Sequence, residues 1–237
     1  MKSSKDTPFE PAKGMERFAR VDTWVFDLDN TLYPFGSPLW PQIDQRITAF
    51  FTGTFGIDGL SARALQKHYY ERYGTSLRGL MVEDGIQPES FLEFVHDIDR
   101  SSLLPNQPLA AAIAALPGRK LILTNGSHTH ALRTCEALGI DHLFDGMFDI
   151  VASDMVPKPE AGIYERFFDK HSVDPSRAAM FEDLSQNLLV PHQRGMATVL
   201  VVERHADLIH PPHIDFTTPD LVGFLQGLRK QASITGV

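Results

Sequence analysis

A short apolar segment that runs into two carboxylates restricts the folds open to this chain. The apolar run 24–26 leads directly into Asp27 and Asp29, which are two residues apart. Successive side chains of a strand alternate between its faces, so both carboxylates would lie on one side and Leu28 would point into the core. The polar, proline-containing run 30–34 ends the strand. The pattern predicts a buried strand that carries two acids to its C-terminal edge, where open α/β sheets bind ligands.

Two carboxylates this close repel each other, and they need a cation or a shared proton to coexist. We therefore expect one of the pair to act as a nucleophile and the other as a proton carrier. In this hypothesis a Mg²⁺ ion lies between the protein and a phosphate group of the substrate.

Charge and composition narrow the class of protein. The chain has 237 residues, enough for one large domain or a core with an insertion, and its 43% hydrophobic content is typical of globular proteins. The net charge of -8 argues against a nucleic-acid polymer or a membrane surface as partner, since both favour a basic face. The single cysteine, Cys135, excludes an internal disulfide and fits a reducing compartment. Without a membrane-spanning run or a secretory signal, a cytoplasmic protein is expected.

Beyond the first strand, short apolar runs alternate with helical patterns. Strands are predicted at 21–27, 120–124, 148–151, 178–181 and 198–202, and helices at 109–116, 127–138, 159–171, 188–194 and 220–230. Such alternation predicts an α/β fold with a doubly wound, Rossmann-like parallel sheet.

One block interrupts this alternation. Residues 37–103 show apolar residues at helical spacing and no convincing strand, so we expect a helical cap inserted after the first strand. The core domain would then comprise residues 21–36 and 104–230, with a flexible leader at 1–20 and a loose tail at 231–237. The insertion leaves the sheet beside the carboxylate pair, where it is well placed to form a lid over the site.

Four polar motifs fall at strand ends or loops on the same edge of the predicted sheet. Taken singly, each has an ordinary explanation as a solvated strand edge, a turn, a surface loop or a helix cap. Their occurrence together, in this order and with an insertion after the first, favours a common functional site. The motifs are Asp27-x-Asp29-x-Thr31, Thr124-Asn125-Gly126-Ser127, Lys158 between Pro157 and Pro159, and Glu182-Asp183 followed by Asn187.

These motifs resemble those of the haloacid dehalogenase (HAD) superfamily, most of whose members are Mg²⁺-dependent phosphohydrolases. The resemblance covers residues 21–203, and the insertion is similar to the helical cap that follows the first motif in that superfamily. The segments 27–34 and 73–80 more narrowly resemble the pyrimidine 5′-nucleotidase branch. That branch includes yeast-type nucleotidases that remove phosphate from UMP and CMP.

The resemblance implies a role for each core motif. Asp27 would attack phosphorus and form an aspartyl-phosphate, while Asp29 would protonate the leaving oxygen and later deprotonate the attacking water. Thr124 would hold the phosphoryl group, helped by the Asn125 main chain, and Lys158 would offset the charge that Asp27 shares with the phosphate. The implied catalytic residues are Asp27, Asp29, Thr124 and Lys158, and the implied phosphate-binding residues are Thr124, Asn125 and Lys158.

The same resemblance implies Mg²⁺ as the cofactor. Its protein ligands would be the Asp27 side chain, the Asp29 main-chain carbonyl and the Asp183 side chain. Many relatives carry a second aspartate four residues after the metal-binding acid, whereas this chain has Asn187 there and Glu182 before Asp183. Secondary roles are assigned to Thr31, Glu182 and Asn187. A water-mediated metal contact of Glu182 and an orienting role of Asn187 both stay open.

Residues of the cap are candidates for substrate recognition. The resemblance places substrate contacts in a loop at 75–79, and the residues assigned to them are Thr75, Ser76 and Arg78. Tyr69 and Tyr73 are spaced i and i+4, which predicts that they pack on one helix face rather than stack on a base. His128 and His130, just after the second motif, are expected to be ordinary residues of a helix surface.

The motifs also distinguish among the reactions of the superfamily. A halide leaving group needs no proton and the superfamily's dehalogenases lack the second aspartate, so Asp29 argues against dehalogenation. We therefore expect a pyrimidine 5′-nucleotidase that acts on a small nucleoside monophosphate, as a monomer or a homodimer. The alternatives are a phosphatase of sugar phosphates or another small metabolite, a phosphomutase, and a catalytically inactive binding protein.

Overall fold

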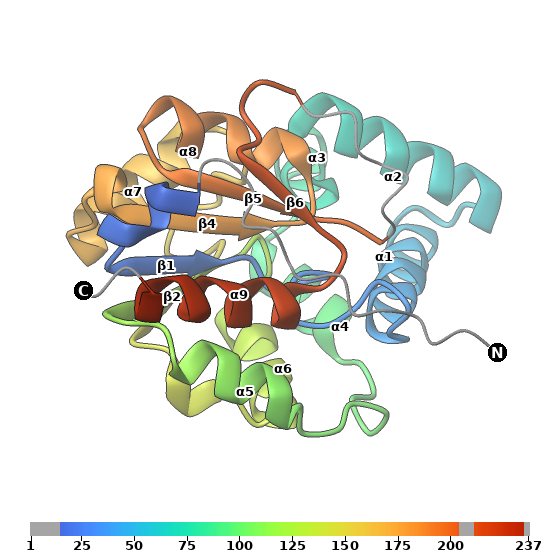
Figure 1. Cartoon of the computed structure of the whole chain (residues 1–237). Helices are drawn as coiled ribbons and strands as arrows, with labels where there is room; N and C mark the ends of the chain where they lie inside the picture. The colour runs from blue at the N-terminus through green and yellow to red at the C-terminus, as the bar shows by residue number, and fades with distance from the viewer. Residues whose placement is uncertain (1–14, 204–210, 235–237) are drawn as a thin grey trace, which may run out of the picture.

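A six-stranded parallel sheet forms the centre of the protein, as a computed structural model that describes residues 15–203 and 211–234 shows (Figure 1). The strand order is β3-β2-β1-β4-β5-β6, so the first strand lies in the middle. The chain winds outward from β1 in one direction and then in the other, which places a topological switch point beside β1. The strands are β1 Thr23–Phe26, β2 Arg119–Leu123, β3 Gly146–Phe148, β4 Ala178–Glu182, β5 Ala197–Val201 and β6 Phe216–Thr218. This confirms the predicted doubly wound α/β fold.

Helices cover both faces of the sheet, which explains why the central strands read as continuous apolar runs (Figure 1). Side chains alternate along β1: Trp24 and Phe26 belong to one apolar cluster and Val25 to the other. Phe26 stacks on Phe181 of β4, with ring centroids 4.8 Å apart. The first face is covered by α5 Gln107–Ala114, α6 His128–Leu138 and α9 Leu221–Ile234, and the second by α7 Ala161–His171 and the short α8 Leu189–Gln193.

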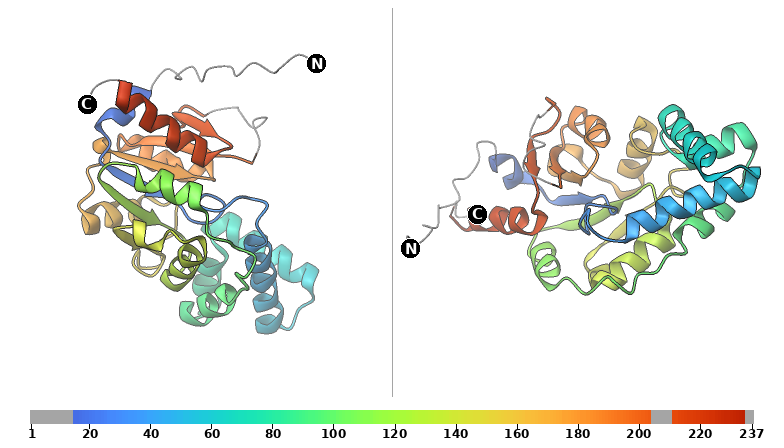
Figure 2. Two further views of the ribbon diagram at one scale, coloured as in Figure 1. Left: turned by 60° about the horizontal axis from the view of Figure 1, so that its bottom comes forward. Right: turned by 90° about the vertical axis from the view of Figure 1, so that its right-hand side faces the viewer.

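Four further helices follow β1 and form the cap, which stands at one end of the molecule (Figure 2). They are α1 Leu39–Phe55, α2 Gly59–Tyr73, α3 Ser76–Asp84 and α4 Pro88–His96. They enclose an apolar cluster of their own, which includes Phe51, Leu80 and Phe91 and also receives Ile150 from the core. The cap is therefore an inserted helical unit with a separate core that touches the sheet domain near β3.

The structure differs from the sequence expectations inside the cap. The segment 75–79, expected as a loop, contains the first turn of α3. Thr75 caps this helix by accepting a hydrogen bond from the Arg78 amide at 3.2 Å. Gly79 allows the helix to lie against Tyr69, because a Cβ atom at this position would lie 2.4 Å from the tyrosine ring. A capping threonine and a close helix contact thus produce a helix that apolar periodicity alone did not indicate.

Parts of the predicted leader and of the predicted tail form helices. Residues 15–20 of the predicted leader form a 3₁₀ helix whose Met15 and Phe18 are buried, and Phe18 stacks on Trp24. At the other end, α9 continues to Ile234 through part of the predicted tail. Residues 1–14 and 235–237 of these two segments lie outside the described residues. The leader prediction was wrong for 15–20 because two apolar side chains reach the main core.

One strand prediction needs correction, and one strand was not predicted. The third strand ends at Phe148, and Ile150 and Val151 lie in the following turn. The strand β6 was not predicted, since its three residues gain their order from pairing with β5. In the described part of the chain, no helix is both long and apolar enough to cross a membrane.

Candidate active site

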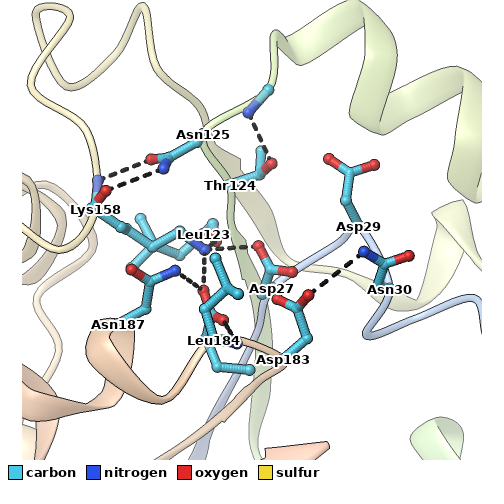
Figure 3. A network of polar contacts seen from close by, with 12 residues as sticks. Asp27, Asp29, Asn30, Leu123, Thr124, Asn125, Lys158, Asp183, Leu184 and Asn187 are labelled. Carbon is cyan, nitrogen blue, oxygen red and sulfur yellow. Dashed lines mark hydrogen bonds and ion pairs between the residues drawn. The ribbon is translucent and has the colours of Figure 1, made fainter. Parts of the chain in front are cut away.

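The predicted site residues of the core meet where β1, β2 and β4 end (Figure 3). Main-chain hydrogen bonds continue past the strand ends, from the Asp27 amide to Phe181 at 2.9 Å and from the Thr124 amide to Phe148 at 3.0 Å. A cavity of about 860 Å³ opens there, between this edge and the cap. The predicted residues that line it are Asp27, Asp29, Thr124, Asn125, Lys158, Glu182, Asp183 and Asn187.

Lys158 is the central cation of the site, and it is 2% exposed. Its Nζ donates hydrogen bonds to Asp27 Oδ1 at 2.6 Å, to Glu182 Oε1 at 2.6 Å and to the Leu123 carbonyl at 2.9 Å. Burial by itself would lower the pKa of Lys158, but the charges of Asp27 and Glu182 raise it above the usual range. The side chain of Asn125 holds the Lys158 backbone with two hydrogen bonds, at 2.8 and 3.2 Å. Lys158 is therefore a fixed, permanently charged neighbour of Asp27.

Glu182 is the second carboxylate that pairs with Lys158, and it is fully buried. Its Oε1 accepts hydrogen bonds from Lys158 and, at 2.7 Å, from Asn187, while Oε2 accepts one from the Leu184 amide at 2.8 Å. Both carboxylate oxygens are thus occupied by protein donors. This geometry fits an anchor for Lys158, oriented in turn by Asn187, better than a metal ligand, although the Glu182 carboxylate lies near those of Asp27 and Asp183.

Asp27, Glu182 and Asp183 bring three carboxylates within 4.8 Å of one another, with one lysine ammonium among them. Burial, opposed by Lys158 and reinforced by Glu182, raises the pKa of Asp27 to about 7. Burial and the charges of Asp27 and Glu182 raise the pKa of Asp183 to about 9. With all three carboxylates ionised, the site would carry more negative charge than Lys158 compensates. Hard oxygen ligands with uncompensated charge fit Mg²⁺, and Asp27 and Asp183 are the side chains that would supply them.

This excess charge predicts that metal-free protein loses stability as the pH rises from about 7 to 9. The pKa of Asp183 is about 9 in the folded state and 3.8 ordinarily, so in this window the folded state holds a proton that the unfolded chain has released. The predicted window starts near pH 7 because His96 has the opposite effect at lower pH. Burial lowers the pKa of His96 to about 3, so below the usual histidine pKa the unfolded chain binds a proton that the folded state does not, and stability rises with pH.

The measurement is the urea midpoint in EDTA at pH 7 and 9, with and without added Mg²⁺. We expect a lower midpoint at pH 9, its recovery by Mg²⁺, and a flatter pH dependence in Asp183→Asn. Equal midpoints at both pH values in the metal-free wild type would contradict the prediction.

Thr124 and Thr31 have different surroundings. Thr124 is fully buried, and its Oγ1 accepts a hydrogen bond from the Gly126 amide at 2.9 Å, which leaves the hydroxyl proton for a ligand in the cavity. Thr31 is also buried, but it does not line the cavity, and its hydroxyl has no hydrogen-bond partner among the described residues. Of the two threonines, only Thr124 lines the cavity.

Asp29 is held by two side chains that donate to the same oxygen. Its Oδ1 accepts hydrogen bonds from Tyr33 Oη at 2.6 Å and from His130 Nε2 at 2.8 Å. Burial would raise the pKa of Asp29, but His130 and the hydrogen bond from Tyr33 lower it below its usual range. In Figure 3 its carboxylate lies apart from the Asp27–Lys158 pair, on the side of Thr124. In this arrangement Asp29 is a carboxylate, the form that accepts a proton.

The expectation that His130 lies on a helix surface was wrong, because its side chain is fully buried. His128, in contrast, is exposed as expected. His130 belongs to the buried stripe of α6 together with Ala131, Thr134 and Cys135. The spacing of 130, 134 and 138 on one helix face was the signal that could have indicated this.

The cap residues predicted to contact substrate are divided by the structure. Thr75 and Ser76 line the cavity, but Arg78 does not. The Arg78 guanidinium instead contacts the Met155 carbonyl at 3.3 Å and Glu160 at 3.6 Å, so it joins the cap to a core loop. Tyr69 and Tyr73 pack against each other on α2, as predicted.

A polar cluster inside the cap was not anticipated. Asp44 accepts hydrogen bonds from Gln66 at 3.0 Å and from Arg63 at 2.8 Å, and Thr48 bridges the same group. Asp44, Arg63 and Gln66 line the cavity opposite the core residues, beside the half-exposed Trp40. These residues come from two helices, so their proximity depends on how α1 and α2 pack.

Comparison with known proteins identifies a family and a relative in yeast. Residues 21–188 match the family described as haloacid dehalogenase-like hydrolase. The chain is 30% identical over 194 residues to phosphate metabolism protein 8 of Saccharomyces cerevisiae, a match that covers 75% of this chain but only 60% of the yeast protein.

Solved structures show the same fold at low sequence identity. CbbY from Rhodobacter sphaeroides, in complex with phosphate, has a TM-score of 0.62 at 17% identity and covers 88% of this chain and 99% of its own. A HAD phosphatase from Thermococcus onnurineus has a TM-score of 0.58 at 17% identity, with 91% and 98% covered. The family match extends over most of the chain and includes every core motif of the site up to Asn187. The protein therefore belongs to the haloacid dehalogenase-like hydrolases.

Proposed function

We propose that the protein is a Mg²⁺-dependent phosphomonoester hydrolase that works through an aspartyl-phosphate. The observation that carries the proposal is the position of Asp27. Its Oδ1 is paired with Lys158, its carboxylate neighbours Asp183, and it faces a cavity that Thr124 also lines. The yeast relative's name, which refers to phosphate metabolism, and the phosphate-bound structural neighbour support the same chemistry.

The geometry suggests how the residues divide the work. Because Oδ1 of Asp27 is bound to Lys158, Oδ2 is the oxygen that attacks phosphorus. The Thr124 hydroxyl holds a phosphoryl oxygen, with the Asn125 main chain beside it, and the charge of Lys158 offsets the charge that Asp27 shares with the phosphoryl group. A Mg²⁺ ion held by Asp27, Asp183 and the Asp29 carbonyl would supply charge neutralisation and orientation.

Asp29 acts as the general acid and the general base of the reaction. It takes up the proton that a phosphomonoester monoanion brings and passes it to the leaving oxygen when Asp27 is phosphorylated. As a carboxylate again, it then removes a proton from the water that hydrolyses the aspartyl-phosphate. Phosphoryl transfer depends mainly on positioning and charge neutralisation, so the residues gathered here are sufficient for both steps.

The cavity favours a substrate that is larger than phosphate alone, and we propose a pyrimidine nucleoside monophosphate. The cap wall combines apolar side chains, among them Trp40, Ile43 and Phe91, with the polar cluster of Asp44, Arg63 and Gln66. An exposed aromatic ring suits a flat base, and neighbouring donors and acceptors suit its polar edge. The same polar cluster would also suit the hydroxyl groups of a sugar phosphate, which is the second candidate.

A panel of phosphomonoesters tests both candidates. With Mg²⁺ we expect phosphate release from UMP and CMP with kcat/KM at least about 10-fold above that for AMP and phosphosugars, because base contacts are worth about 1–3 kcal/mol. EDTA should abolish release and excess Mg²⁺ should restore it.

Each outcome has a distinct meaning. Equal rates for UMP, AMP and phosphosugars would remove the pyrimidine assignment but keep the phosphatase. Transfer of phosphate to a second position of a phosphosugar would favour a phosphomutase. No release from any ester would overturn the hydrolase proposal and leave a binding protein.

A further inference from the structure

Two segments that connect the cap to the core lie beside Asp29 and its partner His130. Tyr33 lies on the segment that enters the cap before α1, and His96 is the last residue of α4, where the chain leaves the cap. His130, from α6 of the core, lies between them. It donates to Asp29 and stacks on His96, with ring centroids 4.4 Å apart and planes inclined by 14°.

The tautomer of His130 follows from its other neighbour. Arg100 Nη2 lies 2.8 Å from His130 Nδ1, and a guanidinium can only donate hydrogen bonds. His130 Nδ1 must therefore accept, so Nε2 carries the hydrogen and donates it to Asp29 Oδ1. Arg100 is itself fixed by the carbonyls of His96 and Ile98 and by the Thr134 hydroxyl.

The two oxygens of Asp29 consequently differ. Oδ1 receives both hydrogen bonds, from Tyr33 and His130, and Oδ2 receives none from the described residues. Oδ2 lies on the cavity side, 3.8 Å from the point where a Cβ of Gly126 would stand, and Thr124 Oγ1 lies 3.3 Å from that same point. One oxygen is held by the protein, and the other faces the place where a phosphoryl group would be bound.

We propose that His130 is a positioning residue for the reaction: its Nε2–H fixes Asp29 through Oδ1 and leaves Oδ2 to carry the proton. This inference rests on the proposed phosphatase function. His130 does not line the cavity, so it acts through Asp29 rather than by touching substrate. The simpler explanation, that the imidazole only fills the core, makes different predictions for the variants below.

A matched pair of variants separates these explanations. The amide nitrogen of His130→Gln reaches the place of Nε2 and keeps a donor toward Asp29, whereas His130→Asn places its amide near Nδ1 and loses that donor. Both variants remove the imidazole and its stacking on His96. A purely structural role would therefore be affected similarly by the two changes.

The main readout is the dependence on the leaving group. An alkyl phosphate such as UMP needs a proton on its leaving oxygen, whereas p-nitrophenolate leaves without one. We expect His130→Asn to lower kcat for the alkyl phosphate at least about 10-fold, within the range of general acid catalysis, with KM changed less than about 3-fold. The first equivalent of p-nitrophenolate should appear at nearly the wild-type rate, and His130→Gln should retain most alkyl phosphatase activity.

A double variant completes the test. In an Asp29→Asn background, His130→Asn should cause no further loss, because its effect passes through Asp29. Losses that multiply, equal losses for both leaving groups, or equal loss in the Gln and Asn variants would overturn the proposal.

A measurement without turnover distinguishes its failure from failure of the proposed function. The imidazole nitrogen shifts of His130 should show the Nε2–H tautomer in the phosphate-free protein. An Nδ1–H tautomer would overturn the positioning contact even in a protein with full activity. A protein that hydrolyses no ester but shows the Nε2–H form would overturn the phosphatase proposal while the contact of His130 with Asp29 stands.

Discussion

Asp27→Asn should reduce kcat for any phosphomonoester by at least about 10⁴-fold while the protein stays folded. An amide cannot form the aspartyl-phosphate, so the loss is that of the nucleophile itself. The fold should persist because the Asn carbonyl can still accept the hydrogen bond that Lys158 now makes to Asp27 Oδ1. Removal of one of three crowded carboxylates should leave the metal-free stability unchanged or raised.

Phosphate release with Mg²⁺ and urea unfolding in EDTA measure the two effects. Asp169→Asn is the matched control, since Asp169 is exposed on α7 and does not line the cavity. This control should keep wild-type activity. If Asp27→Asn retained substantial turnover, another residue would be the nucleophile.

Lys158→Met should be both inactive and strongly destabilised. The variant leaves the buried Asp27 and Glu182 without their common cation, and loss of one partner from a buried ion pair costs about 3–5 kcal/mol of unfolding free energy. The deficit should grow as the pH rises, because protonation of the carboxylates relieves the repulsion at low pH. Added Mg²⁺ should recover part of the stability but not the activity.

Urea unfolding at pH 5 and pH 8 tests this prediction, with Lys67→Met as control. The Lys67 side chain is 76% exposed and pairs with Glu71 at 3.7 Å, so its loss should change stability by less than about 1 kcal/mol. A Lys158→Met protein as stable as this control at pH 8 would show that the carboxylates do not depend on the lysine.

Much of the core site could be predicted because each motif stands next to a strong local signal. Asp27, Thr124 and Asp183 directly follow apolar strands, and the carboxyl ends of parallel strands meet at one edge of a sheet. Burial on both faces makes those strands easy to recognise. The order of the motifs therefore predicted which residues would converge, without any knowledge of distances.

The helices of the cap were less predictable. α1, α2 and α4 have recognisable apolar patterns, but α3 depends on the cap at Thr75 and on the contact of Gly79 with Tyr69. Arg78 carried a chemically suitable side chain, yet the direction of α3 turns it toward Met155 and Glu160 instead of the cavity. The residue type determines which interactions a side chain can make, whereas the packing of its helix determines the direction in which that side chain points.

The sequence by itself determined the parallel sheet, the inserted cap and the acids, hydroxyl and lysine at the sheet edge, because periodicity and strand topology are local properties of the chain. The tertiary structure alone decided the division of labour among the acids. Glu182 became the anchor of Lys158, 24 residues away, and Asp29 became the partner of His130, 101 residues away. Hydrogen bonds form between atoms that the fold brings within about 3 Å, and this distance cannot be read from the separation of two residues along the chain.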